Sequence, residues 1–131
     1  MPVSVSWYDD LHRAVFQRYE GRWTWEDLSH AAQQTRALAD SVPYTVILFI
    51  DMSRASQLPQ GNVLSNGRAA FNMMPTNLTH IIVTMQSQII EVFADLVIKM
   101  LPHWRNRVKF VKTVEEAQKL MADVIAVNTR K

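Results

Sequence analysis

The sequence contains no cysteine and only three glycines. The absence of cysteine excludes disulfides, thiolate metal sites, iron–sulfur clusters and cysteine nucleophiles, and it fits a reducing compartment. The spacing of the glycines matches neither GxxxxGK nor GxGxxG, the patterns of loops that hold phosphates or dinucleotides. The four histidines lie far apart, and none is spaced as a helical metal-binding pair. We therefore expect no metal, no cofactor and no enzymatic activity.

The sequence also lacks a long hydrophobic run and a strong excess of charge. Its longest apolar runs, residues 46–50 and 89–101, fall short of the roughly 20 residues that a membrane-spanning helix needs. Fourteen Lys and Arg against twelve Asp and Glu leave a net charge of +2, too little to indicate a nucleic-acid-binding protein. The first ten residues alternate polar and apolar, unlike a signal peptide. We expect a cytoplasmic protein with no membrane span and no nucleic-acid partner.

The sequence does contain enough apolar residues to form one hydrophobic core. It has 131 residues, of which 48% are hydrophobic and 20% charged, proportions that are ordinary for a globular domain. No internal repeat, low-complexity tract or linker divides the chain. The sequence therefore predicts a single domain over residues 1–131.

The periodicity of apolar residues predicts two kinds of strand. Residues 3–8 and 14–19 alternate like half-buried strands, and the short acidic connection between them predicts an antiparallel hairpin. Residues 44–50 are apolar on both faces, as in a central strand that helices cover on both sides. We expect this strand to stop at Asp51 and a loop to follow over residues 52–61.

The first helix has a well-marked start. Thr24 is placed to cap the first amides of the helix, and Asp27 stands at the capping-box position. Trp23 and Leu28 have the spacing of a hydrophobic staple across the helix start. Pro43 closes the helix.

The remaining chain alternates helix and strand. Helices are predicted over residues 63–74, 87–101 and from 114 onward, and strands over residues 79–85 and 108–112. The resulting order, ββαβαβαβα, predicts an α/β fold with a mixed, mostly parallel five-stranded sheet and about four helices.

Polar residues follow several of the predicted parallel strands, where ligands usually bind in such sheets. The acidic pair Asp9-Asp10, with Asp51, Ser87 and Lys112, imitates the order of functional residues in phospho-receiver domains. The hairpin rules out that fold, because it places Asp9 in a turn instead of at the end of a central strand. An enzyme that uses Asp51 with a neighbouring hydroxyl or histidine remains an alternative.

Three segments resemble a STAS domain, and most closely its SpoIIAA-like branch, the fold of anti-sigma factor antagonists. These segments are residues 21–25 (GRWTW), residues 50–53 (IDMS) and residues 110–117 (FVKTVEEA). The resemblance implies a non-enzymatic regulatory module. Such a module would dock a protein partner, such as a kinase or sigma-factor regulator, through the loop after the third strand and the second helix.

The resemblance also implies a serine that the partner phosphorylates near the start of the second helix. In the antagonists this serine lies in an Asp-Ser-Ser-Gly type of motif, whereas this chain has Asp-Met-Ser-Arg at residues 51–54. A phosphate there would meet free helix amides and change the docking surface. The candidates for partner binding, for the phosphoacceptor and for the cations that pair with it are Asp51, Ser53, Ser56, Ser65, Arg54 and Arg68.

Two further hypotheses come from the apolar residues of the same region. A small-molecule domain would hold a lipid or an anionic ligand in a crevice by the second and third helices, with Leu58, Phe71, Met74 and Ser87 as candidate contacts. A homodimer could form through the exposed edge strand of the hairpin and the Met and Phe surface near Phe71.

Overall fold

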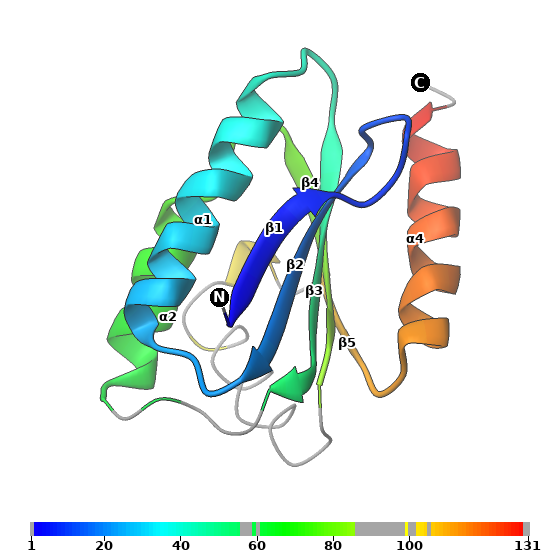
Figure 1. Cartoon of the computed structure of the whole chain (residues 1–131). Coiled ribbons are helices and arrows are strands. Elements are labelled where there is room, and N and C mark those ends of the chain that lie inside the picture. Colours follow the sequence, from blue (N-terminus) through cyan, green and yellow to red (C-terminus); the bar gives the residue numbers. More distant parts are fainter. Residues whose placement is uncertain are drawn as a thin grey trace.

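The protein is an α/β sandwich in which one sheet lies between helices (Figure 1). The computed structural model describes residues 2–55, 59, 61–85, 99, 102–104 and 106–129. The elements within these ranges are β1 (Val3–Trp7), β2 (Ala14–Gly21), α1 (Trp25–Asp40), β3 (Val46–Ala55), α2 (Val63–Asn72), β4 (Leu78–Thr84), a 3-10 turn (Pro102–Trp104), β5 (Val108–Val111) and α4 (Val114–Thr129). The predicted helix over residues 87–101 lies almost entirely outside the described residues.

The five strands form one mixed sheet in the order β1-β2-β3-β4-β5. β1 and β2 are antiparallel, whereas each of the pairs β2/β3, β3/β4 and β4/β5 is parallel. The predicted hairpin and the mostly parallel five-stranded sheet are therefore confirmed. α1 and α2 cover one face of the sheet and α4 covers the other (Figure 1).

The start of α1 is the one that the sequence predicts. The backbone N–H of Asp27 donates to Thr24 Oγ1 at 3.0 Å, and the backbone N–H of Thr24 donates to Asp27 Oδ2 at 2.9 Å. This reciprocal pair satisfies two amides that the helix itself cannot bond. Trp23, just before the cap, is buried beside Leu28 in the same core.

β3 is longer than predicted. The expected stop at Asp51 is wrong, because the strand continues to Ala55 and Asp51 is only 4% exposed. β2 runs beside this extension, and its residues Arg18 and Gly21 pair with Asp51 and Ala55. A neighbouring strand of matching length thus supplies the backbone partners that keep a polar segment extended.

The central position of β3 divides the core in two. Alternate residues Leu48, Ile50 and Met52 belong to the core under α1 and α2, whereas Ile47 and Phe49 belong to the core under α4. Every residue from Val46 to Met52 is buried. The prediction of a central strand covered on both faces is confirmed.

Candidate functional site

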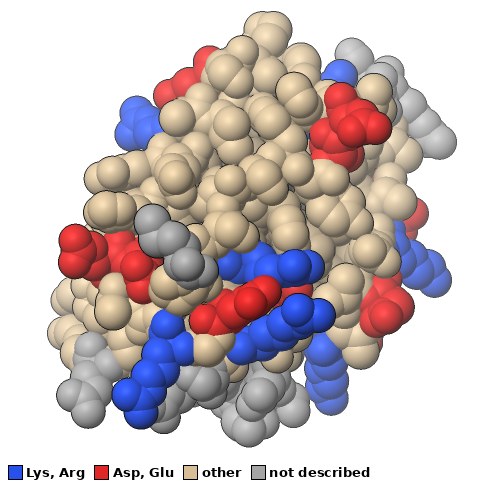
Figure 2. All heavy atoms as spheres, viewed as in Figure 1, with Lys and Arg blue, Asp and Glu red and all other residues tan. Residues whose placement is uncertain are grey.

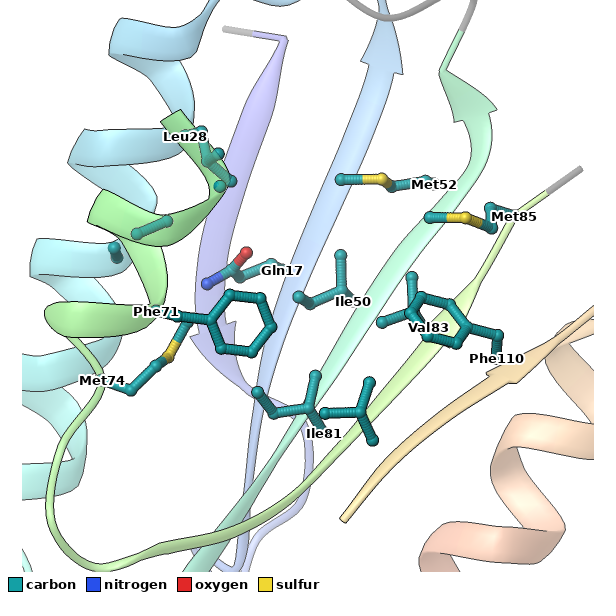
Figure 3. A pocket seen from close by; sticks show the side chains of 14 residues that line it. Gln17, Leu28, Ile50, Met52, Phe71, Met74, Ile81, Val83, Met85 and Phe110 are labelled. Carbon is teal, nitrogen blue, oxygen red and sulfur yellow. The ribbon is translucent and has the colours of Figure 1, made fainter. Parts of the chain in front are cut away.

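An apolar cavity lies between the sheet and the helices α1 and α2 (Figure 3). Its volume is about 60 Å³. The floor consists of inward-facing residues of adjacent strands, among them Ile50 on β3 and Val83 on β4. Leu28 of α1 and Phe71 of α2 form part of the opposite wall, and Figure 3 shows the Phe71 ring directed at the floor.

The cavity exists because small residues of α2 face the sheet without reaching it. Gly67 and Ala70 line the cavity from α2, and α2 packs on α1 beside them. A methyl group or a hydrogen atom cannot fill the space that a larger side chain would occupy at these two positions. Close packing is the rule in protein interiors, so a lined void of this kind calls for an explanation.

Three methionines line the cavity. Met52 lies within β3, Met85 directly follows β4, and Met74 follows α2 (Figure 3). Methionine side chains are unbranched, rotate about three bonds and have a polarizable sulfur atom, so they adapt to irregular apolar shapes. The cavity walls can therefore adjust to a ligand at a lower energetic cost than walls made only of Ile and Val.

Among the described lining residues, Gln17 is the one with a polar side chain. It is 1% exposed; its Nε2 donates to Thr35 Oγ1 at 2.7 Å, and its Oε1 accepts from the Tyr19 hydroxyl at 3.0 Å. Burial, with a smaller contribution from the charge of Asp27, raises the pKa of Tyr19, which therefore stays a protonated donor. The amide nitrogen and oxygen can each make one more hydrogen bond.

Of the predicted crevice residues, the structure brings Phe71 and Met74 together at the cavity wall. The Phe71 ring also packs edge-on against Trp104, with ring centroids 6.0 Å apart. Both side chains are half-buried, so part of each remains at the surface, and the Met and Phe surface expected near Phe71 stays a prediction. Leu58 and Ser87 lie outside the described residues.

The predicted phosphoacceptor region is a separate polar group at the end of β3. The backbone N–H and the hydroxyl of Ser53 both donate to Asp51 Oδ1, at 3.0 and 2.6 Å. Asp51 is 4% exposed, so it acts in this group as the acceptor for Ser53, and the partner-binding role expected for it stays a prediction. Its neighbours across the sheet, Arg18 and Thr84, hold buried atoms (Nε and Oγ1) that lack a partner within the described ranges.

The other predicted polar candidates do not join this group. Arg54 lies 3.8 Å from Glu20, in a cluster of charges near the ends of β2 and β3 (Figure 2). Ser65 is inside α2, where its backbone N–H donates to Asn62 Oδ1 at 3.1 Å, and it is exposed like Arg68. Ser56 lies outside the described residues.

Sequence reasoning missed two features of the cavity, the contact between Gln17 and Thr35 and the void itself. Gln17 lies in the inward phase of β2, between Val15 and Tyr19, and Thr35 lies in the inward stripe of α1. A polar residue at an inward position of each element is a signal that the two side chains bond each other. The void itself has no sequence signal, because its size depends on how far α2 stands from the strands.

Comparisons with known proteins assign no family. No protein-family model matches the chain, and no curated protein does either. Among the helices that the structure describes, none is long and apolar enough to cross a membrane. Within the same residues, no three His, Asp or Glu side chains are grouped to hold a metal ion.

Proposed function

We propose that this protein is a non-enzymatic binding module that holds a small apolar ligand between α1, α2 and the sheet. The cavity carries this proposal, because it is partly open, has an almost wholly apolar lining and lies where a helix stands off the sheet. Ligand sites typically combine such a lining with a few polar groups that orient the ligand. Gln17 would be that group here.

The lining selects the chemistry of the ligand. An alkyl segment or a ring would replace the missing contacts of Ile50, Val83 and Phe71, and one carbonyl or hydroxyl group could bond the Gln17 amide. A cavity of roughly 150 Å³ binds benzene. With about 60 Å³, this one would take a chain end or require the methionines to move.

Partner docking through α2 remains a second candidate, with the geometry of that helix in its favour. The inner side of α2 lines the cavity through Gly67 and Ala70, whereas Ser65, Arg68 and Ala69 are exposed. A ligand under α2 would therefore contact the helix whose outer side is available to a partner. Phosphorylation of Ser53 would first have to break its hydrogen bond to Asp51.

A filled cavity provides the test. Ala70→Leu places a larger apolar side chain in the void, and Ala69→Leu adds the same side chain at the exposed position next to it. Dodecanoate and the fluorescent probe N-phenyl-1-naphthylamine should bind the natural protein and the Ala69→Leu control alike. Ala70→Leu should weaken binding at least about tenfold and keep or raise the melting temperature, because it replaces empty space by contacts.

Two results would contradict the proposal. One is a natural protein that binds neither probe and carries no ligand in native mass spectrometry after gentle purification. The other is an Ala70→Leu variant that binds both probes as well as Ala69→Leu does. If pull-down nevertheless recovers a protein that Arg68→Glu releases, partner docking becomes the better account.

A further inference from the structure

The outer edge of β1 is free to pair with another strand. β1 pairs only with β2 within the described part of the chain. The N–H of Glu20 donates to the C=O of Pro2, and the N–H of Tyr8 donates to the C=O of Ala14, in a register without a bulge. Even-numbered residues of β1 therefore bond β2, and the N–H and C=O groups of Val3, Val5 and Trp7 point outward.

Within the described residues, β1 lacks the charges, prolines and bulges that often protect sheet edges. Its sequence, VSVSW, contains no charge and no proline. The opposite edge, β5, is shorter and has Lys109 within it and Lys112 directly after it. The exposed sides of Val3, Val5 and Trp7 add apolar surface along the free edge.

The surface around β1 has the charge pattern of an interface. Figure 2 views the molecule from the side of β1, and a broad uncharged area over β1 and the neighbouring helix is bordered by acidic and basic side chains. Tyr8 and Leu11, in the turn after β1, are two of the three large hydrophobic residues that are exposed in the described ranges. Depletion of charge at the centre with charge at the rim is typical of protein–protein contacts.

We infer that β1 pairs with β1 of a second copy of this chain, antiparallel and about a two-fold axis at Val5. This register matches every outward N–H with a C=O, because Val5 faces Val5 of the other copy and Val3 faces Trp7. The same register places Ser4 opposite Ser6 on the other face of the sheet. The two sheets join into one, and the interface is isologous, as closed dimers require.

The two α1 helices would face each other across this axis. α1 contacts both β1 and β2, so it covers the edge pair of strands on one face of the sheet. A two-fold axis that joins antiparallel edge strands into one sheet is perpendicular to that sheet, so both copies of α1 lie on the same face.

Charge placed at the edge tests the inference. In Ser4→Glu/Ser6→Glu the new carboxylates face each other across the proposed interface, whereas within one copy Glu at position 4 faces Arg18 favourably. The control, Gln118→Glu/Ala122→Glu, adds the same charge at exposed positions of α4. Light scattering should give about twice 15.1 kDa for the natural chain and the control. The edge variant should dissociate roughly tenfold or more readily, with little change in melting temperature.

Cysteines test the register independently, since the natural chain contains none. Ser4 and Ser6 of opposite copies would form a non-hydrogen-bonded pair, with Cα atoms about 4.5 Å apart, a distance that suits a disulfide. A mixture of Ser4→Cys and Ser6→Cys chains should give far more oxidised dimer than either chain alone. A natural chain that is monomeric at about 100 µM, or an edge variant that dimerises like the control, would overturn the inference. Equal oxidation of mixed and single chains would also overturn it.

Discussion

The two faces of the sheet are covered in different ways. On one face α4 places Ala117 and Met121 against the strands, and both residues are almost fully buried. On the other face α1 and α2 leave a cavity beneath Gly67 and Ala70 of α2. Small residues thus have different effects on the two faces. They let α4 approach the sheet closely, whereas they leave a void under α2, which packs on α1 and stays farther from the strands.

On the face that α4 covers (the closed face), aromatic rings pack over the part of the sheet that α4 does not cover. Tyr8 and Phe16 pack on Phe49, with ring centroids 5.7 and 5.1 Å from it. Phe49 is 1% exposed and lies at the centre of this group. On the face that α1 and α2 cover (the open face), the aromatic residue Phe71 is half-buried beside the cavity. We therefore expect the loss of an aromatic ring to cost more unfolding free energy on the closed face than on the open face.

The largest expected effect is that of Phe49→Ala. Removal of a fully buried ring from a packed core costs about 3–5 kcal/mol of unfolding free energy. Phe71→Ala should cost about 1–2 kcal/mol, because that ring is half-exposed and already borders empty space. Urea denaturation of both variants measures the difference. Equal losses would mean that the two faces are packed alike.

A smaller loss of unfolding free energy is expected when the hydrogen bonds of Gln17 on the open face are removed. Gln17→Met keeps the size of the side chain but leaves Thr35 Oγ1 and the Tyr19 hydroxyl without their partner. Unsatisfied buried polar groups cost about 1–3 kcal/mol each, so we expect a loss of about 2 kcal/mol or more.

Replacement of the whole polar group separates this cost from poor packing. In Gln17→Met/Tyr19→Phe/Thr35→Val no hydroxyl or amide remains unpaired, and most of the stability should return. If the triple variant is no more stable than Gln17→Met, the loss comes from packing and the hydrogen bonds are not its cause.

The smallest effect concerns pH and belongs to the α4 face. Burial, followed by the charges of Arg107 and Lys109, lowers the pKa of His80, which lies near Asp123. As the pH falls through the ordinary histidine range, the unfolded chain takes up this proton first. His80 therefore stabilises the fold above its ordinary pKa and loses that contribution below it.

The His80→Gln variant isolates this contribution. Between about pH 7.5 and pH 5, its melting temperature should fall less than that of the natural chain. No histidine is among the described residues that line the cavity, so Ala70→Leu should keep the natural slope. Parallel slopes for His80→Gln and the natural chain would show that His80 is not the group that titrates.

Much of the fold could be predicted from local patterns. The alternation in residues 3–8 and 14–19 predicted the hairpin, and Thr24 with Asp27 predicted the start of α1, because these patterns depend on near neighbours. The end of β3 was wrong for the opposite reason. Asp51 is a poor strand residue by itself, but β2 lies beside it and supplies its backbone partners.

The candidate site residues also divide into those that local sequence patterns place correctly and those whose roles stay predictions. Asp51 and Ser53 could be predicted to lie together, since they are two residues apart at the end of one strand. Phe71 and Met74 could be placed near a crevice from the inward stripe of their helix. The likeness to a STAS domain stays a prediction, as do the roles of Ser56, Leu58 and Ser87.

By itself, the sequence determined the order of the strands and helices that the structure describes, the inward stripe of each and the capped start of α1. Each of these depends on the spacing of residues along a few turns or one strand. Only the tertiary structure decided that Gln17 meets Thr35 and that α2 leaves a cavity. Those features depend on distances between segments far apart in the chain, which are decided when all side chains compete for the same interior space.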